Sequence, residues 1–169
     1  MHWQAVIEFP KMKVAVATRD VNGNPFVAGI RYLPSTAESK APENGLAERT
    51  ARQLERYRED PDAKFDLPLL IEGTDFQKKL WQALCEIPRG RTLTYGEMAR
   101  KLGGADFESA RAVGQACGDN RLPIVIPCHR VVAAGGIGGF SHTTDGYLIE
   151  AKRWLLMHES SADAFALKP

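Results

Sequence analysis

Residues 123–131 read Pro-Ile-Val-Ile-Pro-Cys-His-Arg-Val, and the rest of the chain is interpreted outward from them. The apolar residues 123–126 are interpreted as a strand that leaves the interior. Pro127 fixes φ at its end, and the thiol of Cys128, the imidazole of His129 and the guanidinium of Arg130 follow. We interpret Pro127 as the first position of a short helical turn, which places Cys128 beside free backbone N–H groups. These groups and the charge of Arg130 are expected to lower the pKa of the thiol and to favour the nucleophilic thiolate.

His129 follows Cys128 directly, but neighbouring side chains of an extended chain point to opposite sides. Contact between the two side chains therefore requires a tight turn or a bridging water. A buried, inert cysteine after a core strand is the alternative interpretation of the same residues.

The segment 127–131 resembles the acceptor-site signature of the O6-alkylguanine-DNA alkyltransferases, also called methylated-DNA–protein-cysteine methyltransferases. Asn120 precedes the signature and a glycine-rich loop follows it. Further segments resemble family blocks in family order: residues 74–81 (TDFQKKLW), 87–97 (IPRGRTLTYGE), 111–114 (RAVG) and 154–159 (WLLMHE). The resemblance is close from residue 74 to residue 159 and weak before it.

The composition is ordinary for a globular protein, with 44% hydrophobic and 25% charged residues among 169. No apolar run approaches the ~18 residues of a membrane span, and the amino terminus lacks the charged and apolar regions of a signal peptide. We therefore expect a cytoplasmic protein without a membrane partner. Cys85, Cys117 and Cys128 have no Cys-x-x-Cys spacing, so neither a disulfide framework nor a metal site is predicted.

The net charge of +1 hides an uneven distribution. Residues 76–132 carry 9 Lys and Arg against 5 Asp and Glu, whereas residues 1–75 carry 10 against 12. Positive charge therefore collects in the segment that contains Cys128, which favours a nucleic-acid partner.

Residues 1–72 are interpreted as a small α/β supporting domain. Apolar segments on both sides of Asn22-Gly-Asn-Pro25 predict two short strands joined by a tight turn. An amphipathic helix is predicted over residues 47–57 and one more strand over residues 65–71. The domain boundary is placed after Glu72.

Residues 73–169 are interpreted as a mainly α-helical, DNA-binding and alkyl-acceptor domain. Thr74 or Asp75 caps a first helix, and Thr94-Tyr-Gly-Glu97 is a capping box that begins a second. A third helix is predicted over about residues 108–117 and a last one, capped by Asp145, over residues 146–158. The apolar face of the first helix is formed by Phe76, Leu80, Trp81, Leu84 and Ile87.

The second and third of these helices have the spacing of a helix-turn-helix, and the resemblance implies a winged-helix-like form of it. Arg111 is flanked by the small residues Ala110 and Gly114. Small side chains let the third helix approach a DNA groove closely, and the long side chain of Arg111 can reach into the groove. A plain packing helix with a surface arginine fits the same pattern. Residues 135–139 contain four glycines and predict a loop whose N–H groups approach a ligand; a phosphate cradle is the alternative.

The resemblance implies that Cys128 accepts the alkyl group from O6-alkylguanine, and possible action on O4-alkylthymine is left open. His129 would take the thiol proton through a water, Glu159 would orient the imidazole, and Asn120 would brace the turn before the acceptor. Arg111 would fill the space left by the flipped nucleotide. The implied substrate pocket is formed by Tyr95, Cys128, Val131, Phe140 and Ser141, and the implied DNA contacts come from Thr94, Tyr95, Ala110, Arg111, Gly114, Arg121 and Arg130.

The product would be a thioether, so each molecule would act once and no metal or organic cofactor is called for. We expect a monomer that acts on double-stranded alkylated DNA, with clustering along DNA left open. This chain departs from the family pattern at Arg121, at Phe140 and in a longer loop at residues 142–145. A cysteine hydrolase and a non-catalytic DNA-binding module are the alternative functions.

Overall fold

The structure is a computed structural model that describes residues 2–104, 107–138 and 146–160. The chain divides into two compact units, residues 1–72 and residues 73–169. Within the described residues, none of the helices combines the length and the apolar character that crossing a membrane demands.

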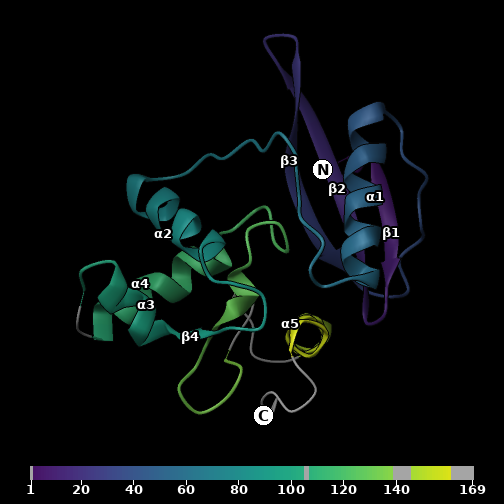
Figure 1. The fold of residues 1–169 in the computed structure, drawn as a ribbon. Coiled ribbons are helices and arrows are strands. Elements are labelled where there is room, and N and C mark those ends of the chain that lie inside the picture. Colours follow the sequence, from purple (N-terminus) through teal and green to yellow (C-terminus); the bar gives the residue numbers. More distant parts are fainter. Residues whose placement is uncertain (1, 105–106, 139–145, 161–169) are drawn as a thin grey trace. The chain divides into compact units, whose positions relative to one another are not determined.

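The first unit contains an antiparallel sheet with the strand order β1-β2-β3. The sequence predicted two strands here, and the additional one is β1, which pairs with β2 over its whole length. The predicted tight turn joins β2 to β3: Asn22 and Gly23 have φ values of 53° and 83°, as a type I′ hairpin turn requires. The strands are Ala5–Phe9 (β1), Met12–Val21 (β2) and Asn24–Leu33 (β3) (Figure 1).

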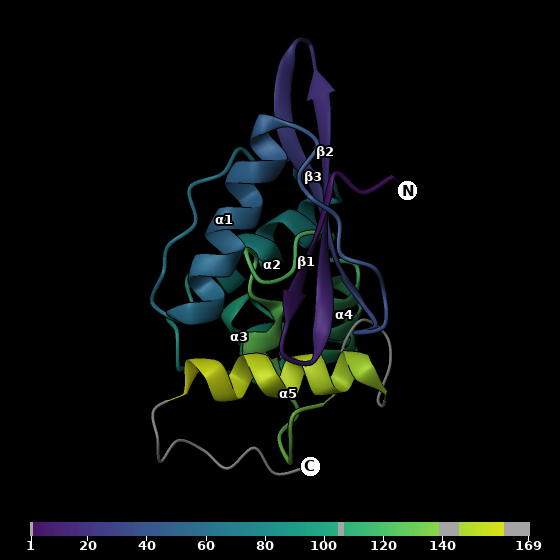
Figure 2. The same cartoon turned by 90° about the vertical axis from the view of Figure 1, so that its right-hand side faces the viewer.

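The helix α1, Gly45–Glu59, contacts all three strands and lies along the sheet (Figure 2). Asn44 begins it, because the side-chain oxygen of Asn44 accepts a hydrogen bond from the backbone N–H of Ala47 at 2.8 Å. The buried apolar residues of the helix recur at helical spacing and form the core of this unit together with the sheet. They are Ala47, Ala51, Leu54 and Tyr57.

The strand predicted over residues 65–71 does not form. The segment makes one parallel bridge, between Val27 and Leu69. The N–H of Val27 donates to the carbonyl of Pro68 at 2.8 Å, and the N–H of Leu70 donates to the carbonyl of Val27 at 2.9 Å. Pro68 has no N–H of its own, and a proline inside an apolar run interrupts strand pairing.

The second unit is mainly helical. The capping box of Thr94 and Glu97 is confirmed, and Thr74 forms another with Gln77. Phe76 is an exception to the predicted apolar face, since it is 39% exposed. The helices are Asp75–Cys85 (α2), Tyr95–Lys101 (α3), Phe107–Gly118 (α4) and Tyr147–Glu159 (α5), with one 3-10 turn, Cys128–Arg130 (η1).

A short parallel ladder joins two parts of this unit that are distant in sequence. Leu93 pairs with Val131 and Thr94 pairs with Val132, which makes the strands Leu93–Thr94 (β4) and Val131–Val132 (β5). Since β4 leads directly into α3 and β5 directly follows η1, the ladder holds the first turn of α3 beside the Cys-His-Arg turn (Figure 1).

Gly73→Ala is expected to destabilise the second unit. A Cβ at this position would lie 2.7 Å from Oε1 of Gln77 and 2.8 Å from two ring carbons of the buried Trp81. Overpacking of this kind costs about 1–3 kcal/mol. The measurement is urea unfolding. Gly45→Ala is the matched control, because a Cβ there meets nothing within 4 Å and alanine favours a helix. Equal losses in the two variants would contradict the close approach at Gly73.

Candidate active site

Cys128 lies in a short helical turn, as predicted. Cys128, His129 and Arg130 form η1, and Pro127 is its N-terminal cap. The preceding residues do not form the predicted strand. Instead, the N–H of Ile126 donates to the carbonyl of Leu122 at 2.8 Å, and Ile124 has a φ of 72°. The backbone therefore reaches Cys128 through a turn.

Asn120 holds this turn in shape. Its Nδ2 donates to the carbonyl of Ile126 at 2.8 Å, and its Oδ1 accepts from the N–H of Leu122 at 2.9 Å. Its side chain also hydrogen-bonds to Cys128. Because Asn120 follows the end of α4 by two residues, it connects this helix to the acceptor turn.

The thiol of Cys128 is enclosed, and the residue is only 5% exposed. Burial raises the pKa of Cys128 above its ordinary value, while the hydrogen bond from Asn120 and the charge of Lys152 act in the opposite direction. The lowered pKa predicted from the helical turn and Arg130 is therefore wrong. The neutral thiol is the resting form, and it needs a base before it can attack.

A candidate base follows Cys128 in the same turn. His129 is fully buried, and its Nε2 lies 2.8 Å from Oε2 of Glu159, the last residue of α5. Since a carboxylate accepts this bond, Nε2 is the donor, and in the neutral imidazole Nδ1 keeps its lone pair. Nδ1 is buried and has no hydrogen-bond partner within the described residues. It is thus able to accept a proton inside the site.

Arg130 also contacts Glu159, although the sequence analysis expected it to contact DNA. Its Nε donates to Oε1 of Glu159 at 2.9 Å and its Nη2 to Oε2 at 3.0 Å. Its side chain is 13% exposed. Burial alone would raise the pKa of Glu159, but His129 and Arg130 outweigh burial and hold this pKa well below its usual range.

Lys152 is a residue of this site that the sequence analysis missed. It lies on α5 and is fully buried, with its Nζ 2.8 Å from the carbonyl oxygen of Val131 and 3.5 Å from the hydroxyl of Tyr95. Burial lowers the pKa of Lys152 to about 8, although Cys128 and Cys117 act to raise it. Its position two helical turns before Glu159 is a signal that could have revealed it, because both side chains share one helix face.

Tyr95 lies next to Lys152 and is the first residue of α3. Burial raises the pKa of its hydroxyl well above the usual range, and Cys117 and Cys128 raise it further. A Cβ at Gly138 would lie 3.1 Å from its ring, and one at Gly114 would lie 3.9 Å from it. The start of α3, the middle of α4 and the loop after β5 thus meet around one aromatic ring.

The other predicted residues lie apart from this cluster or outside the described residues. Arg111 on α4 and Arg121 after it are exposed, whereas Ala110 and Gly114 are half-buried. The hydroxyl of Thr94 accepts from the N–H of Glu97 as the cap of α3. The residues outside the described ranges are Phe140, Ser141, the longer loop at 142–145 and its predicted cap Asp145.

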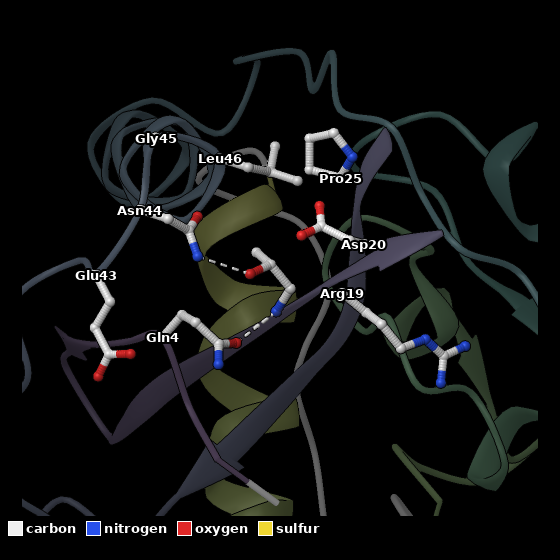
Figure 3. Close-up of a pocket in the computed structure, with 9 residues that line it drawn as sticks. Gln4, Arg19, Asp20, Pro25, Glu43, Asn44, Gly45 and Leu46 are labelled. Atoms are coloured by element: carbon white, nitrogen blue, oxygen red, sulfur yellow. Dashed lines mark hydrogen bonds between the residues drawn. The ribbon is translucent and has the colours of Figure 1, made fainter. Parts of the chain in front are cut away.

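A pocket of about 530 Å³ lies in the first unit, where α1 begins (Figure 3). Its polar groups are bonded to one another: Oε1 of Gln4 accepts from the N–H of Thr18 at 2.6 Å, and Nδ2 of Asn44 donates to the hydroxyl of Thr18 at 2.9 Å. Arg19 pairs with Glu72 at 3.0 Å. These contacts stabilise the unit, and they bring together no nucleophile and base.

The fold places the enclosed Cys128 in the same turn as His129, whose imidazole pairs with the buried carboxylate of Glu159. Residues 75–161 match the family model described as 6-O-methylguanine DNA methyltransferase, DNA binding domain. A methylated-DNA–protein-cysteine methyltransferase of Methanosarcina acetivorans is 44% identical over 112 residues, which cover 66% of this chain and 67% of the relative. Its Mycobacterium tuberculosis counterpart is 39% identical over 139 residues, 80% of this chain and 81% of the relative.

The fold agrees with these matches. The crystal structure of Mycobacterium tuberculosis OGT in complex with DNA has a TM-score of 0.74 at 34% identity and covers 94% of this chain and 93% of its own. The chain therefore belongs to the methylated-DNA–protein-cysteine methyltransferase family, the alkyltransferases of DNA repair.

Lys152→Met is expected to slow the reaction of Cys128 with iodoacetamide, because it removes a positive charge that favours the thiolate. The difference should be largest below about pH 8, where Lys152 is charged, and should shrink above it. Each unit of thiol pKa changes the thiolate population about tenfold. The rate is followed by mass spectrometry of the Cys128 peptide. Lys101→Met is the matched control at an exposed site on α3, and an equal effect there would exclude a local interaction.

Proposed function

We propose that this protein repairs duplex DNA by moving an alkyl group from O6 of guanine to Sγ of Cys128. The observation that carries the proposal is the enclosed Cys128 thiol in the same short turn as His129, whose imidazole pairs with Glu159. This cluster lies within the residues that match the family's DNA-binding domain, and the names of the relatives support the same chemistry.

The transfer exchanges one bond for another. Sγ of Cys128 attacks the alkyl carbon, the S–C bond forms and the O6–C bond breaks, and the bonding electrons stay with the guanine. The thiol proton passes through a water to Nδ1 of His129, whose imidazole Glu159 orients. Water donates a proton to the departing base and restores neutral guanine, and His129 returns the thiol proton to water, so the overall exchange is neutral. The lone pair of Nδ1, buried and without a partner among the described residues, supports this route.

The burial of Cys128 requires the damaged base to leave the duplex. Extruding a base costs a few kcal/mol, since stacking and pairing are lost. Arg111 is exposed on α4, and the small neighbours Ala110 and Gly114 allow close approach of this helix to the minor groove. The side chain of Arg111 is proposed to fill the space that the extruded base leaves in the duplex. The Mycobacterium tuberculosis relative was solved in complex with DNA, which supports a DNA partner.

The flipped base is proposed to meet Tyr95, Ser141 and the carbonyls of Cys128 and Val131. The carbonyl of Val131 already accepts from Lys152. A carbonyl oxygen has two lone pairs, so this one retains capacity for the exocyclic amine of guanine. O4-alkylthymine is included as a second substrate.

Residues 73–169 are proposed to bind DNA through α3 and α4 as a winged-helix-like helix-turn-helix. Exposed cations lie on or next to these helices, which suits contacts with phosphates. These cations are Arg100, Lys101, Arg111 and Arg121. Residues 1–72 are proposed to support this unit.

The reaction is proposed to be stoichiometric. Its product is a thioether on Cys128, and no ordinary hydrolytic step cleaves a C–S bond of this kind. Each molecule therefore repairs one lesion, and the exchange of bonds needs neither a metal ion nor an organic cofactor.

Incubation with excess O6-methylguanine duplex should add one methyl group to the Cys128 peptide and to no other peptide. Cys128→Ala should abolish this gain and still bind the oligonucleotide, because the variant changes the nucleophile alone. The measurements are peptide mass spectrometry and a gel-shift titration. Tight binding with unchanged mass in the unaltered protein would instead indicate a non-catalytic module, and ester turnover without DNA binding would indicate a hydrolase.

Arg111→Ala should slow the repair of duplex DNA more than the reaction with free O6-methylguanine base, since the free base needs no extrusion. The measurement compares both rates with those of the unaltered protein. Arg121→Ala is the matched control: it also removes an exposed cation, and it is expected to weaken binding without separating the two rates. An equal loss in both assays for Arg111→Ala would argue against a role in flipping.

A further inference from the structure

The guanidinium of Arg130 is directed at a carboxylate of the site. We infer that Arg130 is a positioning residue for alkyl transfer, which acts by holding the carboxylate of Glu159 against His129. The inference rests on the proposed function, because it concerns how the base of that reaction is kept ready.

The guanidinium of Arg130 forms hydrogen bonds on two sides. On one side, Nε donates to Oε1 of Glu159 at 2.9 Å and Nη2 donates to Oε2 at 3.0 Å. Nη1 donates to the carbonyl of Ile87 at 2.6 Å, just beyond the end of α2. A planar guanidinium bonded on both sides has one orientation available. Arg130 therefore acts as a rigid link between the end of α2, η1 and the end of α5.

This link determines which oxygen His129 meets. Oε2 of Glu159 lies 2.8 Å from Nε2 of His129 and 3.0 Å from Nη2 of Arg130, so the two donors share it. With Oε1 also bonded to Arg130, the carboxylate cannot rotate away from the imidazole. The imidazole is thereby kept with Nε2 protonated and Nδ1 as the acceptor for the Cys128 proton.

Arg130 also balances charge at the buried carboxylate. Glu159 is 2% exposed, and a buried carboxylate that loses a cationic partner is strongly destabilised. Without Arg130, the carboxylate would lose a cation that balances its charge. A protonated imidazole has no lone pair for the thiol proton, so removing this cation is expected to make the transfer rate more sensitive to acid.

The other charged groups near the pair come from the elements packed against it. Nη1 of Arg89, from the connection after α2, donates to the main-chain carbonyl of Glu159 at 2.9 Å. Lys152 from α5 interacts electrostatically with Cys128. Arg130 bonds to both oxygens of the Glu159 carboxylate.

The test is the pH dependence of single-turnover methyl transfer in Arg130→Met and Arg130→Lys. In Arg130→Met, the acid limb of the profile should move to higher pH by about one unit or more, which is the scale of a lost neighbouring charge. In Arg130→Lys, the limb should return toward that of the unaltered protein, because the charge is restored. Its plateau rate should stay lower, because an ammonium cannot grip both oxygens.

Arg89→Met is the matched control, since it removes a cation at the same end of α5 that donates to the main-chain carbonyl of Glu159. Its acid limb should not move. A lower plateau with an unmoved limb in Arg130→Met would show a merely structural role and would overturn the inference. If Arg130→Met does not fold, Arg130→Gln takes its place, since it also removes the charge: a shifted acid limb supports the inference, and a lower plateau with an unmoved limb overturns it.

The same assay separates this inference from the proposed function. Absence of methyl transfer in the unaltered protein would refute the proposed function itself. Transfer by the unaltered protein, together with an unmoved acid limb in Arg130→Met, would refute the positioning role alone.

Discussion

The buried carboxylate of Glu159 is the constraint on which the acceptor region depends. Glu159 is 2% exposed, and a buried carboxylate is stable only where hydrogen-bond donors surround it. Two of these donors are His129 and Arg130 from η1. Arg89 bonds to the main chain of the same residue. Satisfying this one group therefore fixes the end of α5 against η1 and against the connection after α2. The tautomer of His129 follows from the same contact.

The thiol beside this pair is controlled by opposing effects. Burial favours the neutral form of Cys128, whereas Asn120 and Lys152 favour the thiolate. Burial dominates, so reactivity does not come from a permanently ionised sulfur. In the proposed reaction, it depends on a base that takes the proton when the substrate is in place. This arrangement limits side reactions of the thiol with other electrophiles, because the thiol is reactive as an anion.

Local signals in the sequence predicted local structure well. The Asn22-Gly23 turn and the capping box of Thr94 and Glu97 are confirmed, since a few adjacent residues determine each. The strand predicted over residues 65–71 was wrong because Pro68 interrupts pairing within an otherwise apolar run.

The partners of the site side chains were harder to predict, because they come from distant parts of the chain. Arg130 was expected to contact DNA, but it donates to the carbonyl of Ile87, which is 43 residues away. Lys152 was overlooked because a lysine in an amphipathic helix is usually solvated, and its partner Val131 is 21 residues away. Family resemblance supplied Cys128, His129 and Glu159 as candidates, and their roles remain proposals.

The positive φ of Ile124 limits how this protein can evolve. A β-branched residue in the left-handed region carries about 1–3 kcal/mol of strain, which surrounding bonds must offset. The amide of Asn120 supplies two of them, one as donor and one as acceptor. Aspartate would lose the donor, and glutamine is one methylene longer. Mutational drift at position 120 is thus restricted by the shape of the backbone, independently of any selection on catalysis.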